Sequence, residues 1–309
     1  MLSIVVPIYN EEESIKMFYD ELIKVIPSLD KNIEILFVDD GSTDSSLEII
    51  KELAKKNKII KVFSFRRNLG KSDALTLGFQ KAKGNYIVTL DADLQDRPDQ
   101  IKKLLDKAMS GYDLVCGWRK YRKDASRHVI SSRIFNFLAN KLWGLSLHDY
   151  NCGLKVYTEE AAQNLNIYGS LHRFIPLFLY QKGFVVSELE VEHEKRRYGK
   201  SKYGLSKVWK DLPDIFTMIF LSKYTRQPLH FFGTIGGAMI FIGLVFFIYL
   251  QIVHATGEPI ASRPLFFISL ILIVSGLQVF FTGFLADLLI NVTNQKERTF
   301  LLKYSSEPQ

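Results

Sequence analysis

An acidic segment that could bind a metal ion, Asp91-Ala92-Asp93-Leu94-Gln95-Asp96, directly follows an apolar run that ends at Leu90. We predict that this run is a β-strand, so Asp91, Asp93 and Gln95 lie at its carboxyl end, where open α/β sheets bind their ligands. Carboxylate and amide oxygens are the ligands that Mg²⁺ and Mn²⁺ prefer. We therefore predict a divalent metal site here, in which the ion would stabilise a departing diphosphate.

Polar segments follow three further apolar runs: Pro7 to Glu11, Asp39 to Asp44, and Arg66 to Ser72. Between them they supply an aromatic ring that could stack on a nucleotide base and carboxylates that could accept hydrogen bonds from the base or the ribose. The third segment also supplies a glycine turn and Lys71 at the start of a helix, which could face phosphate. Each segment alone could be a helix cap or an Asx turn, and we expect no more than that of Ser42 and Asp44. Four such segments after four strands are hard to explain by capping, and they indicate a nucleotide site.

The elements that must position these residues alternate along the first part of the chain, as in a parallel sheet covered by helices. We predict an α/β fold with a Rossmann-like, mostly parallel sheet and strands at Ser3–Ile8, Glu34–Val38, Ile60–Phe65, Tyr86–Leu90 and Leu114–Gly117. We expect Asn10 to cap the first helix, and Pro98 to open a later one. The buried stripe of the first helix is expected to be Ile15, Phe18, Leu22 and Ile26.

Length and composition allow more than one structural unit. The chain has 309 residues, of which 47% are hydrophobic and 24% charged, with a formal net charge of +7. Domains average about 150 residues, so two units are expected, and the apolar content excludes a disordered chain. The positive charge fits an anionic membrane surface or a phosphate-bearing ligand. Two cysteines, Cys116 and Cys152, cannot form a disulfide framework, and we expect reduced thiols.

Two runs near the C-terminus, Leu229–Val253 and Leu265–Ala286, contain no Asp, Glu, Lys or Arg. Each exceeds the roughly 18 to 20 residues that cross a bilayer core as a helix. Basic residues precede the first run and follow the second, so we expect both termini and the catalytic domain in the cytoplasm. Four glycines of the first run would permit close helix packing, within the chain or between subunits of a homo-oligomer; the alternative is that they are ordinary glycines of a membrane helix. They are Gly233, Gly236, Gly237 and Gly243.

Basic residues also cluster between Gly117 and Arg133, opposed only by Asp124. Such a cluster requires an anionic partner, because like charges repel one another. Nucleic-acid binding would need base-stacking aromatic residues among the charges or a recognisable binding motif. The sequence has neither, so we expect no nucleic acid as partner.

Together, the motifs resemble the family 2 glycosyltransferases of GT-A fold. The residues that carry the resemblance are Pro7-Ile8-Tyr9-Asn10-Glu11, Asp39 to Asp44, Asn68-Leu69-Gly70-Lys71, and Asp91 to Pro98. More narrowly, essentially the whole chain looks like dolichyl-phosphate mannose synthases and bacterial bactoprenol (undecaprenyl-phosphate) glucosyltransferases.

This resemblance implies roles for individual residues. The nucleotide sugar would be bound by Pro7, Tyr9, Glu11, Asp39, Asp40, Lys71, Arg196 and Ser201, the last two from a loop that closes over the phosphates. The metal and donor diphosphate would be held by Asp91, Asp93 and Gln95. Arg119 and Arg133 would bind the acceptor phosphate. Asp149 would orient the acceptor or act as a base, although a phosphate that is already anionic needs none.

The resemblance also implies the domain plan and the reaction. A cytoplasmic GT-A domain would span residues 1–203, followed by an amphipathic interfacial segment at 204–228, a two-helix transmembrane domain at 229–290 and a cytoplasmic tail at 291–309. A helix packed on the soluble domain is the alternative for the amphipathic segment.

The expected reaction is the inverting transfer of a hexose, with glucose from UDP-glucose favoured, to a polyisoprenyl (undecaprenyl) phosphate at the cytoplasmic membrane face. The alternatives for the donor are GDP-mannose, as in a polyprenyl-phosphate mannose synthase, and an amino-pentose nucleotide. A non-enzymatic nucleotide-binding membrane module is the alternative of another class. A processive polysaccharide synthase would be expected to carry a Gln-x-x-Arg-Trp segment, which this chain lacks.

Overall fold

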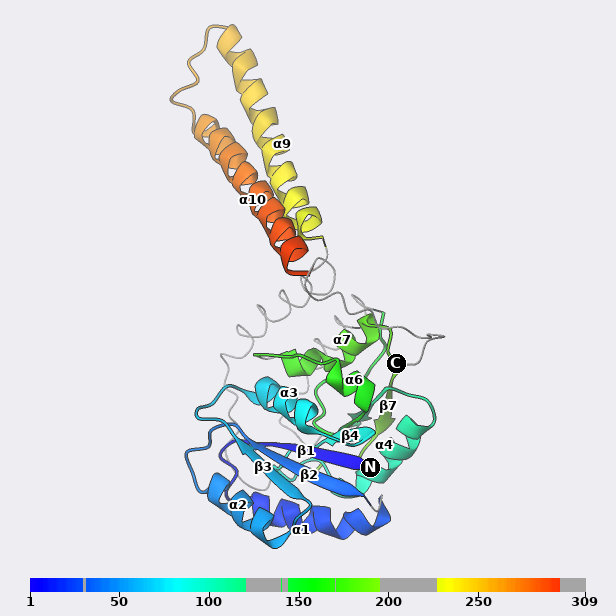
Figure 1. Ribbon diagram of the computed structural model, residues 1–309. Coiled ribbons are helices and arrows are strands. Elements are labelled where there is room, and N and C mark those ends of the chain that lie inside the picture. The colour runs from blue at the N-terminus through cyan, green and yellow to red at the C-terminus, as the bar shows by residue number, and fades with distance from the viewer. Residues whose placement is uncertain (30–31, 121–139, 141–143, 170, 195–226, 295–309) are drawn as a thin grey trace. The chain divides into compact units, whose positions relative to one another are not determined.

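The computed structural model describes residues 1–29, 32–120, 140, 144–169, 171–194 and 227–294 (Figure 1). The chain divides into two compact units, Met1–Asp214 and Ile215–Gln309. Most of the expected amphipathic segment and of the expected C-terminal tail falls outside the described residues. The four-part division of the chain therefore stays a prediction.

The first unit is built on one seven-stranded sheet with the strand order β3-β2-β1-β4-β6-β5-β7. Its strands are β1 (Leu2–Ile8), β2 (Ile33–Asp39), β3 (Ile60–Ser64), β4 (Tyr86–Thr89), β5 (Leu114–Trp118), β6 (Lys155–Thr158) and β7 (Val186–Glu190). The first five confirm the predicted strands to within one residue at each end. The mostly parallel α/β sheet is confirmed as well.

Strand β6 runs against the rest of the sheet. It is antiparallel to both neighbours, β4 and β5, whereas the other paired strands are parallel. A reversed strand begins at the edge where its neighbours end, and Lys155 at the start of β6 accordingly pairs with Thr89 at the end of β4. The chain just before β6 is thereby brought to the carboxyl edge of the sheet.

Helices cover both faces of the sheet (Figure 1). On one face lie α1 (Ile15–Val25), α2 (Ser46–Lys56) and α4 (Ile101–Met109); on the other lie α3 (Lys71–Lys81), α6 (Glu159–Gln163) and α7 (Ile175–Gln181). Three short 3₁₀ turns adjoin these helices: η1 (Ile26–Ser28) follows α1, η2 (Pro98–Gln100) leads into α4, and η3 (Leu171–Phe174) leads into α7.

Strand β1 is buried on both faces because each face packs on a different helix layer. Ile4 and Val6 belong to the core that contains Phe18 of α1. Val5 points to the opposite face, where a Cβ added to Gly78 of α3 would lie 2.3 Å from its Cγ1 atom. Close approach of α3 to the centre of the sheet thus depends on a glycine.

The expected cap of α1 is wrong. The helix begins at Ile15, and Asn10 lies before it with a φ of +53°. The Asn10 side chain instead accepts a hydrogen bond of 2.8 Å from the Thr43 amide, because it is used to join the loops after β1 and β2. Three residues of the expected stripe are buried, while Ile26 is partly buried in η1. Pro98 does open η2, which leads into α4.

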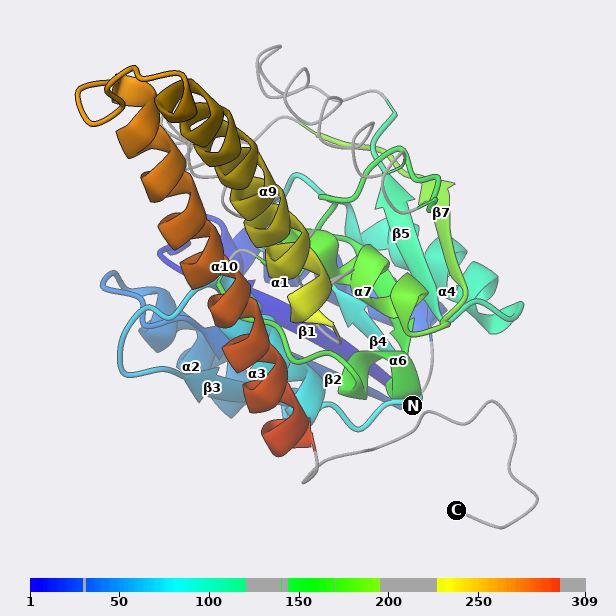
Figure 2. The same ribbon diagram turned by 90° about the horizontal axis from the view of Figure 1, so that it is seen from above.

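The second unit contains the two predicted spans as the helices α9 (Pro228–Ala255) and α10 (Pro264–Asn294). Both are long and apolar enough to cross a membrane. They lie side by side in both views (Figures 1 and 2). Large apolar side chains cover their outer surfaces, with Phe241 and Leu289 each 68% exposed. Such a surface suits lipid and does not suit water.

Glycines bring α9 and α10 into backbone contact. A Cβ added to Gly236 would lie 2.6 Å from the Gly276 carbonyl oxygen, and one added to Gly243 would lie 2.9 Å from the Ser269 carbonyl oxygen. At Gly237 nothing lies within 4 Å. Two of the four glycines noted in the sequence therefore serve packing within the chain, and a homo-oligomer stays a prediction.

We expect the Gly236→Ala substitution to destabilise the helix pair by about 1–3 kcal/mol, because the added methyl group overpacks the contact with Gly276. Gly237→Ala is the matched control and should be neutral or stabilising by up to about 1 kcal/mol, since alanine has the higher helix propensity. SDS titration of the full-length protein, followed by circular dichroism, measures both. Equal effects of the two substitutions would contradict the packing.

Candidate active site

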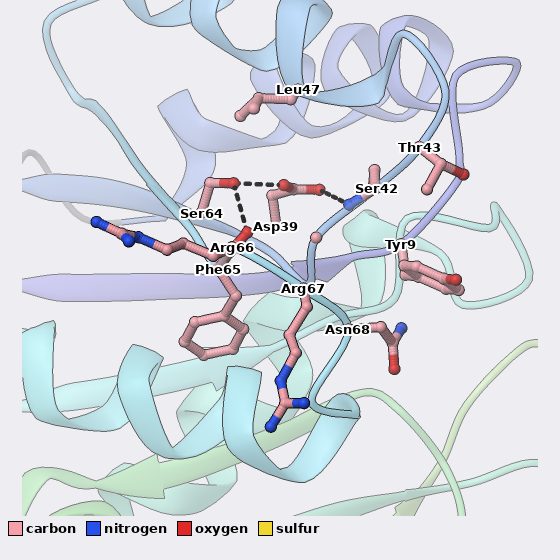
Figure 3. Close-up of a pocket in the computed structure, with 11 residues that line it drawn as sticks. Tyr9, Asp39, Ser42, Thr43, Leu47, Ser64, Phe65, Arg66, Arg67 and Asn68 are labelled. Carbon is pink, nitrogen blue, oxygen red and sulfur yellow. Dashed lines mark hydrogen bonds between the residues drawn. The ribbon is translucent and has the colours of Figure 1, made fainter.

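A pocket of about 490 Å³ lies among the loops that follow β1, β2 and β3 (Figure 3). Of the predicted nucleotide-binding residues, Tyr9 and Asp39 line it. Asp39 accepts a hydrogen bond of 3.1 Å from the Ser42 amide and one of 2.6 Å from the Ser64 hydroxyl, which fixes its carboxylate. The remaining lining residues are Gly41, Ser42, Thr43, Leu47, Ser64, Phe65, Arg66, Arg67 and Asn68.

The pocket combines an aromatic ring, a fixed carboxylate and two guanidinium groups. Arg66 and Arg67 point in different directions from the same loop (Figure 3). Rings stack on bases, carboxylates accept from base or ribose donors, and arginine binds phosphate. The pocket therefore has the chemistry that a nucleotide requires. The contribution of Phe65 was missed, because that residue was expected to lie inside the third strand.

Four other predicted nucleotide residues, Pro7, Glu11, Asp40 and Lys71, do not appear among the lining residues, and their contact with a nucleotide stays a prediction. Asp40 holds the turn before α3: it accepts hydrogen bonds of 2.7 Å from the Leu69 amide and 3.0 Å from the Gly70 amide. Burial raises the pKa of Asp40, and these two bonds only partly oppose the rise. The carboxylate thus connects β2 to the start of α3.

Lys71 forms an ion pair with Asp91. Its Nζ atom lies 2.6 Å and 2.7 Å from the two carboxylate oxygens, so the first residue of α3 joins the loop after β4. Burial acts to raise the pKa of Asp91, but the charge and hydrogen bonds of Lys71 outweigh it and hold this pKa below its usual range. Asp91 is therefore ionised at neutral pH. Gly70, with a φ of +109°, makes the turn that aims Lys71.

The predicted metal ligands lie on one tight turn. Leu94 is buried with a φ of +61°, and the Gln95 amide donates a 3.2 Å hydrogen bond to Asp93 Oδ1. Within the described part of the chain, no three His, Cys, Asp or Glu side chains converge as a metal site. The hard oxygen donors of Asp93 and Gln95, beside Asp91, nevertheless fit a divalent cation. Such a cation would share Asp91 with Lys71.

A third acid, Asp96, belongs to the site although the sequence analysis gave it no role. It is 3% exposed and accepts a 3.1 Å hydrogen bond from the Leu154 amide. Burial raises the pKa of Asp96; the charge of Arg119 opposes the rise, and that of Asp91 adds to it. The segment that contains Leu154 reaches Asp96 only because β6 is antiparallel to its neighbours. No sequence pattern indicates that this strand is reversed.

Gly153 passes between the two acids. A Cβ at this position would lie 2.6 Å from Asp91 Oδ2 and 2.9 Å from Asp96 Oδ2. The Gly153 carbonyl oxygen accepts a 2.8 Å hydrogen bond from the Thr89 hydroxyl, so the backbone is fixed in this position. Only a residue without a side chain leaves both carboxylates where they are.

Arg119, the predicted ligand of the acceptor phosphate, pairs with Asp149. Its Nε lies 2.7 Å from Asp149 Oδ2 and its Nη2 lies 3.1 Å from Oδ1, with only 10% and 3% of the two side chains exposed. The Asn151 amide donates a further bond of 3.0 Å to Oδ1. Both Asp149 oxygens thus accept hydrogen bonds, and the choice between an orienting role and that of a base stays a prediction.

Three predicted site residues, Arg133, Arg196 and Ser201, lie outside the described residues. The structure adds Lys155, the first residue of β6, which the sequence analysis passed over. Lys155 is 5% exposed, and its ammonium group donates to the Cys152 carbonyl oxygen. The two cysteines are both buried and free, as expected.

Residues 3–165 match the pattern described as glycosyl transferase family 2, and the chain belongs to this family. It is 33% identical over 296 residues to a dodecaprenyl-phosphate galacturonate synthase of Rhizobium johnstonii, across 93% of this chain and 87% of that protein. It is 31% identical over 293 residues to an undecaprenyl-phosphate 4-deoxy-4-formamido-L-arabinose transferase of Pseudomonas paraeruginosa, across 94% and 85%. The predicted resemblance to polyprenyl-phosphate glycosyltransferases is confirmed, and the protein is a glycosyltransferase.

A solved structure supports the fold. The glucosyl-3-phosphoglycerate synthase of Mycobacterium tuberculosis, in complex with Mn²⁺, UDP-glucose and glycerol 3-phosphate, has a TM-score of 0.54 and 19% identity. The match covers 72% of this chain and 79% of that chain. This likeness confirms the predicted GT-A fold.

We expect Gly153→Ala to destabilise the protein by about 1–3 kcal/mol, because the methyl group would overlap the Asp91 carboxylate. In an Asp91→Ala background the same substitution should cost at least about 0.5 kcal/mol less, because one of the two clashing groups is gone. Denaturation of the full-length protein in detergent, followed by tryptophan fluorescence, gives the four free energies of unfolding of this cycle. Additive costs would contradict the described contact.

Proposed function

We propose that the protein transfers a sugar from a nucleotide sugar to polyprenyl phosphate at the cytoplasmic face of a membrane. The observation that carries the proposal is the placement of two ion pairs around the same carboxyl edge of the sheet: Lys71–Asp91, which is partly exposed, and Arg119–Asp149, which is buried. One pair lies beside the proposed metal ligands and the other presents a guanidinium group for a second anion. The full-length similarity to polyprenyl-phosphate sugar transferases supports this assignment.

On the donor side, we place the base in the pocket lined by Tyr9 and Asp39. Asp91, Asp93 and Gln95 would hold Mg²⁺ or Mn²⁺ against the diphosphate, as the Mn²⁺ and UDP-glucose named for the mycobacterial structure suggest. A divalent cation bound there neutralises charge on the leaving diphosphate. Further positive charge would come from Lys71 and, from the loop outside the described residues, Arg196; Ser201 of that loop would donate to the phosphates.

On the acceptor side, Arg119 would bind the lipid phosphate, together with Arg133. Asp149 fixes the Arg119 guanidinium by two hydrogen bonds, so it positions the acceptor indirectly. The second pKa of a phosphate monoester is about 6, so the acceptor is largely dianionic at neutral pH. No protein base is then needed to remove a proton.

The proposed step is a single in-line displacement. An oxygen of the lipid phosphate attacks the anomeric carbon and forms the new carbon–oxygen bond. The bond from that carbon to the diphosphate breaks, and its electron pair leaves with the nucleoside diphosphate. Attack opposite the leaving group inverts the anomeric configuration. The helices α9 and α10 would keep the chain at the bilayer that contains the lipid, with both termini in the cytoplasm.

The sugar is the open part of this proposal. Glucose from UDP-glucose is the expectation from the sequence, whereas the two relatives are named for galacturonate and for 4-deoxy-4-formamido-L-arabinose. The second of these is an amino-pentose, which was one of the alternatives from the sequence. GDP-mannose is the remaining alternative donor.

We expect the full-length protein to convert undecaprenyl phosphate into one lipid-linked sugar, identified by mass spectrometry. The donors to be compared are UDP-glucose, UDP-galacturonate, UDP-4-deoxy-4-formamido-L-arabinose and GDP-mannose, each with Mn²⁺ and with a chelator. Chelation and Asp93→Ala should each lower the rate at least about 100-fold. Asp99→Ala, which changes an exposed acid on the same segment, is the matched control. Binding of a nucleotide sugar without turnover would favour a nucleotide-binding module.

We expect the lipid-linked product to have the anomeric configuration opposite to that of the donor. Nuclear magnetic resonance of the product, from the one-bond carbon–hydrogen coupling at the anomeric centre, gives the configuration. Retention would instead require a covalent sugar intermediate on a protein nucleophile, and it would exclude the single displacement.

A further inference from the structure

Two hydroxyl groups on one face of α3 clamp the segment that leads into η3. Thr76 Oγ1 donates to the Ile167 carbonyl oxygen at 2.9 Å and accepts from the Ile167 amide at 3.2 Å. One turn earlier, Ser72 Oγ donates to the Gly169 carbonyl oxygen at 2.7 Å and accepts from the His172 amide at 3.1 Å. These four bonds fix the register of η3 on α3. They place His172 beside Ser72, the residue that follows Lys71.

The hydrogen bonds of Ser72 determine where the His172 ring carries its proton. Ser72 Oγ also lies 3.0 Å from His172 Nδ1. A hydroxyl has one hydrogen, and the Gly169 carbonyl takes it, because a carbonyl can only accept. The ring nitrogen must therefore donate to Ser72. In a neutral ring this leaves the proton on Nδ1 and a lone pair on Nε2.

The surroundings keep this ring neutral. The charged groups that act on it are Lys71 from α3, Lys155 from β6, Arg173 from η3 and Asp91 from the loop after β4. Burial, followed by the positive charges of Lys71 and Arg173, holds the pKa of His172 well below its usual range; Asp91 opposes this effect without reversing it. Nε2 is thus a hydrogen-bond acceptor at neutral pH.

An uncharged hydrogen-bond acceptor can do what the positively charged residues around His172 cannot. Lysine and arginine side chains only donate, so they suit the oxygens of a diphosphate or a phosphate. A sugar hydroxyl also carries a hydrogen that needs an acceptor. Asp91 could also accept, but its carboxylate pairs with Lys71, is proposed to bind the metal ion, and carries a negative charge. His172 supplies an acceptor that adds no negative charge next to the donor phosphates.

We propose that His172 is a sugar-binding residue of this site, whose Nε2 accepts a hydrogen bond from a hydroxyl group of the donor sugar. Ser72 is then a positioning residue, because it holds the ring by Nδ1. This inference rests on the proposed function for the identity of the donor as a nucleotide sugar. His172 is partly buried, and an acceptor that is left desolvated and unpaired when the sugar binds is costly, so such a contact discriminates against donors that lack the hydroxyl.

Two substitutions separate the two ring nitrogens. His172→Asn retains a donor near the position of Nδ1 and removes the acceptor at Nε2. His172→Gln extends an amide oxygen to the position of Nε2 and loses the bond to Ser72. Affinities for UDP and for UDP-glucose, UDP-galacturonate and UDP-4-deoxy-4-formamido-L-arabinose are measured by calorimetry on the full-length protein. Melting temperatures are measured in parallel.

We expect His172→Asn to bind the preferred UDP-sugar about 10-fold more weakly than the wild type, with UDP affinity unchanged. His172→Gln should stay within about 3-fold for both, although it should melt at the lower temperature because the Ser72 bond is gone. The order of affinity is then the reverse of the order of stability. If the two orders coincide, or if UDP and UDP-sugar weaken equally, the ring has only a structural role and the proposal fails.

Monodeoxy analogues of the preferred donor identify the hydroxyl. One analogue should bind the wild type about 10-fold more weakly than the parent donor, and the same analogue and parent should bind His172→Asn equally. Unchanged discrimination in His172→Asn would overturn the contact. Because the readout is donor binding, it needs no lipid: absence of a lipid product rejects the polyprenyl acceptor, whereas these affinities test His172 independently.

Discussion

Pairing of charge is the constraint around which this site is arranged. Asp91 follows the central strand β4 with 30% of its side chain exposed, and Lys71 compensates its negative charge with contacts of 2.6 and 2.7 Å. The lysine reaches Asp91 because Gly70 turns the chain. Asp40 holds that turn by accepting hydrogen bonds from the Leu69 and Gly70 amides. The ion pair thus depends on the segments that follow β2, β3 and β4. It also helps to fix the loop after β4, which contains the proposed metal ligands.

A second ion pair extends this electrostatic network along the edge of the sheet. Arg119 and Asp149 form it, and Asp96 lies between the two pairs, with its pKa raised by burial, lowered by Arg119 and raised again by Asp91. The sheet topology makes this arrangement feasible. Because β6 is antiparallel, the chain just before it lies at the carboxyl edge of the sheet, where Gly153 passes between Asp91 and Asp96 of the loop after β4.

The sequence was most informative where the chain is locally regular. Strands β1 to β5 were predictable because each is a short apolar run between helical segments, and the polar residues after them were predictable because parallel strands end at one edge. The same reasoning missed Asp96 and Gly153, whose importance comes from contacts with each other's segments. It missed β6 and β7 because the alternation of strand and helix breaks down after β5.

Side-chain roles were harder to predict than positions. Asn10 has the right residue type for a helix cap, yet α1 begins only at Ile15, and the Asn10 side chain accepts a hydrogen bond from the Thr43 amide in the loop after β2 instead. His172 lies in a segment without any motif. Its tautomer follows from the hydrogen bonds of Ser72, a residue distant in sequence, and no pattern in either segment predicts that they meet.

The ion pair of Arg119 and Asp149 also joins two distant points of the sequence. Arg119 follows β5 and Asp149 precedes β6, and the two residues are 30 positions apart. With the ends fixed, changing the length of the intervening segment costs little closure entropy, about 0.6 kcal/mol for each doubling. The number of residues between Arg119 and Asp149 can therefore change at little cost while the ion pair at the sheet edge is preserved.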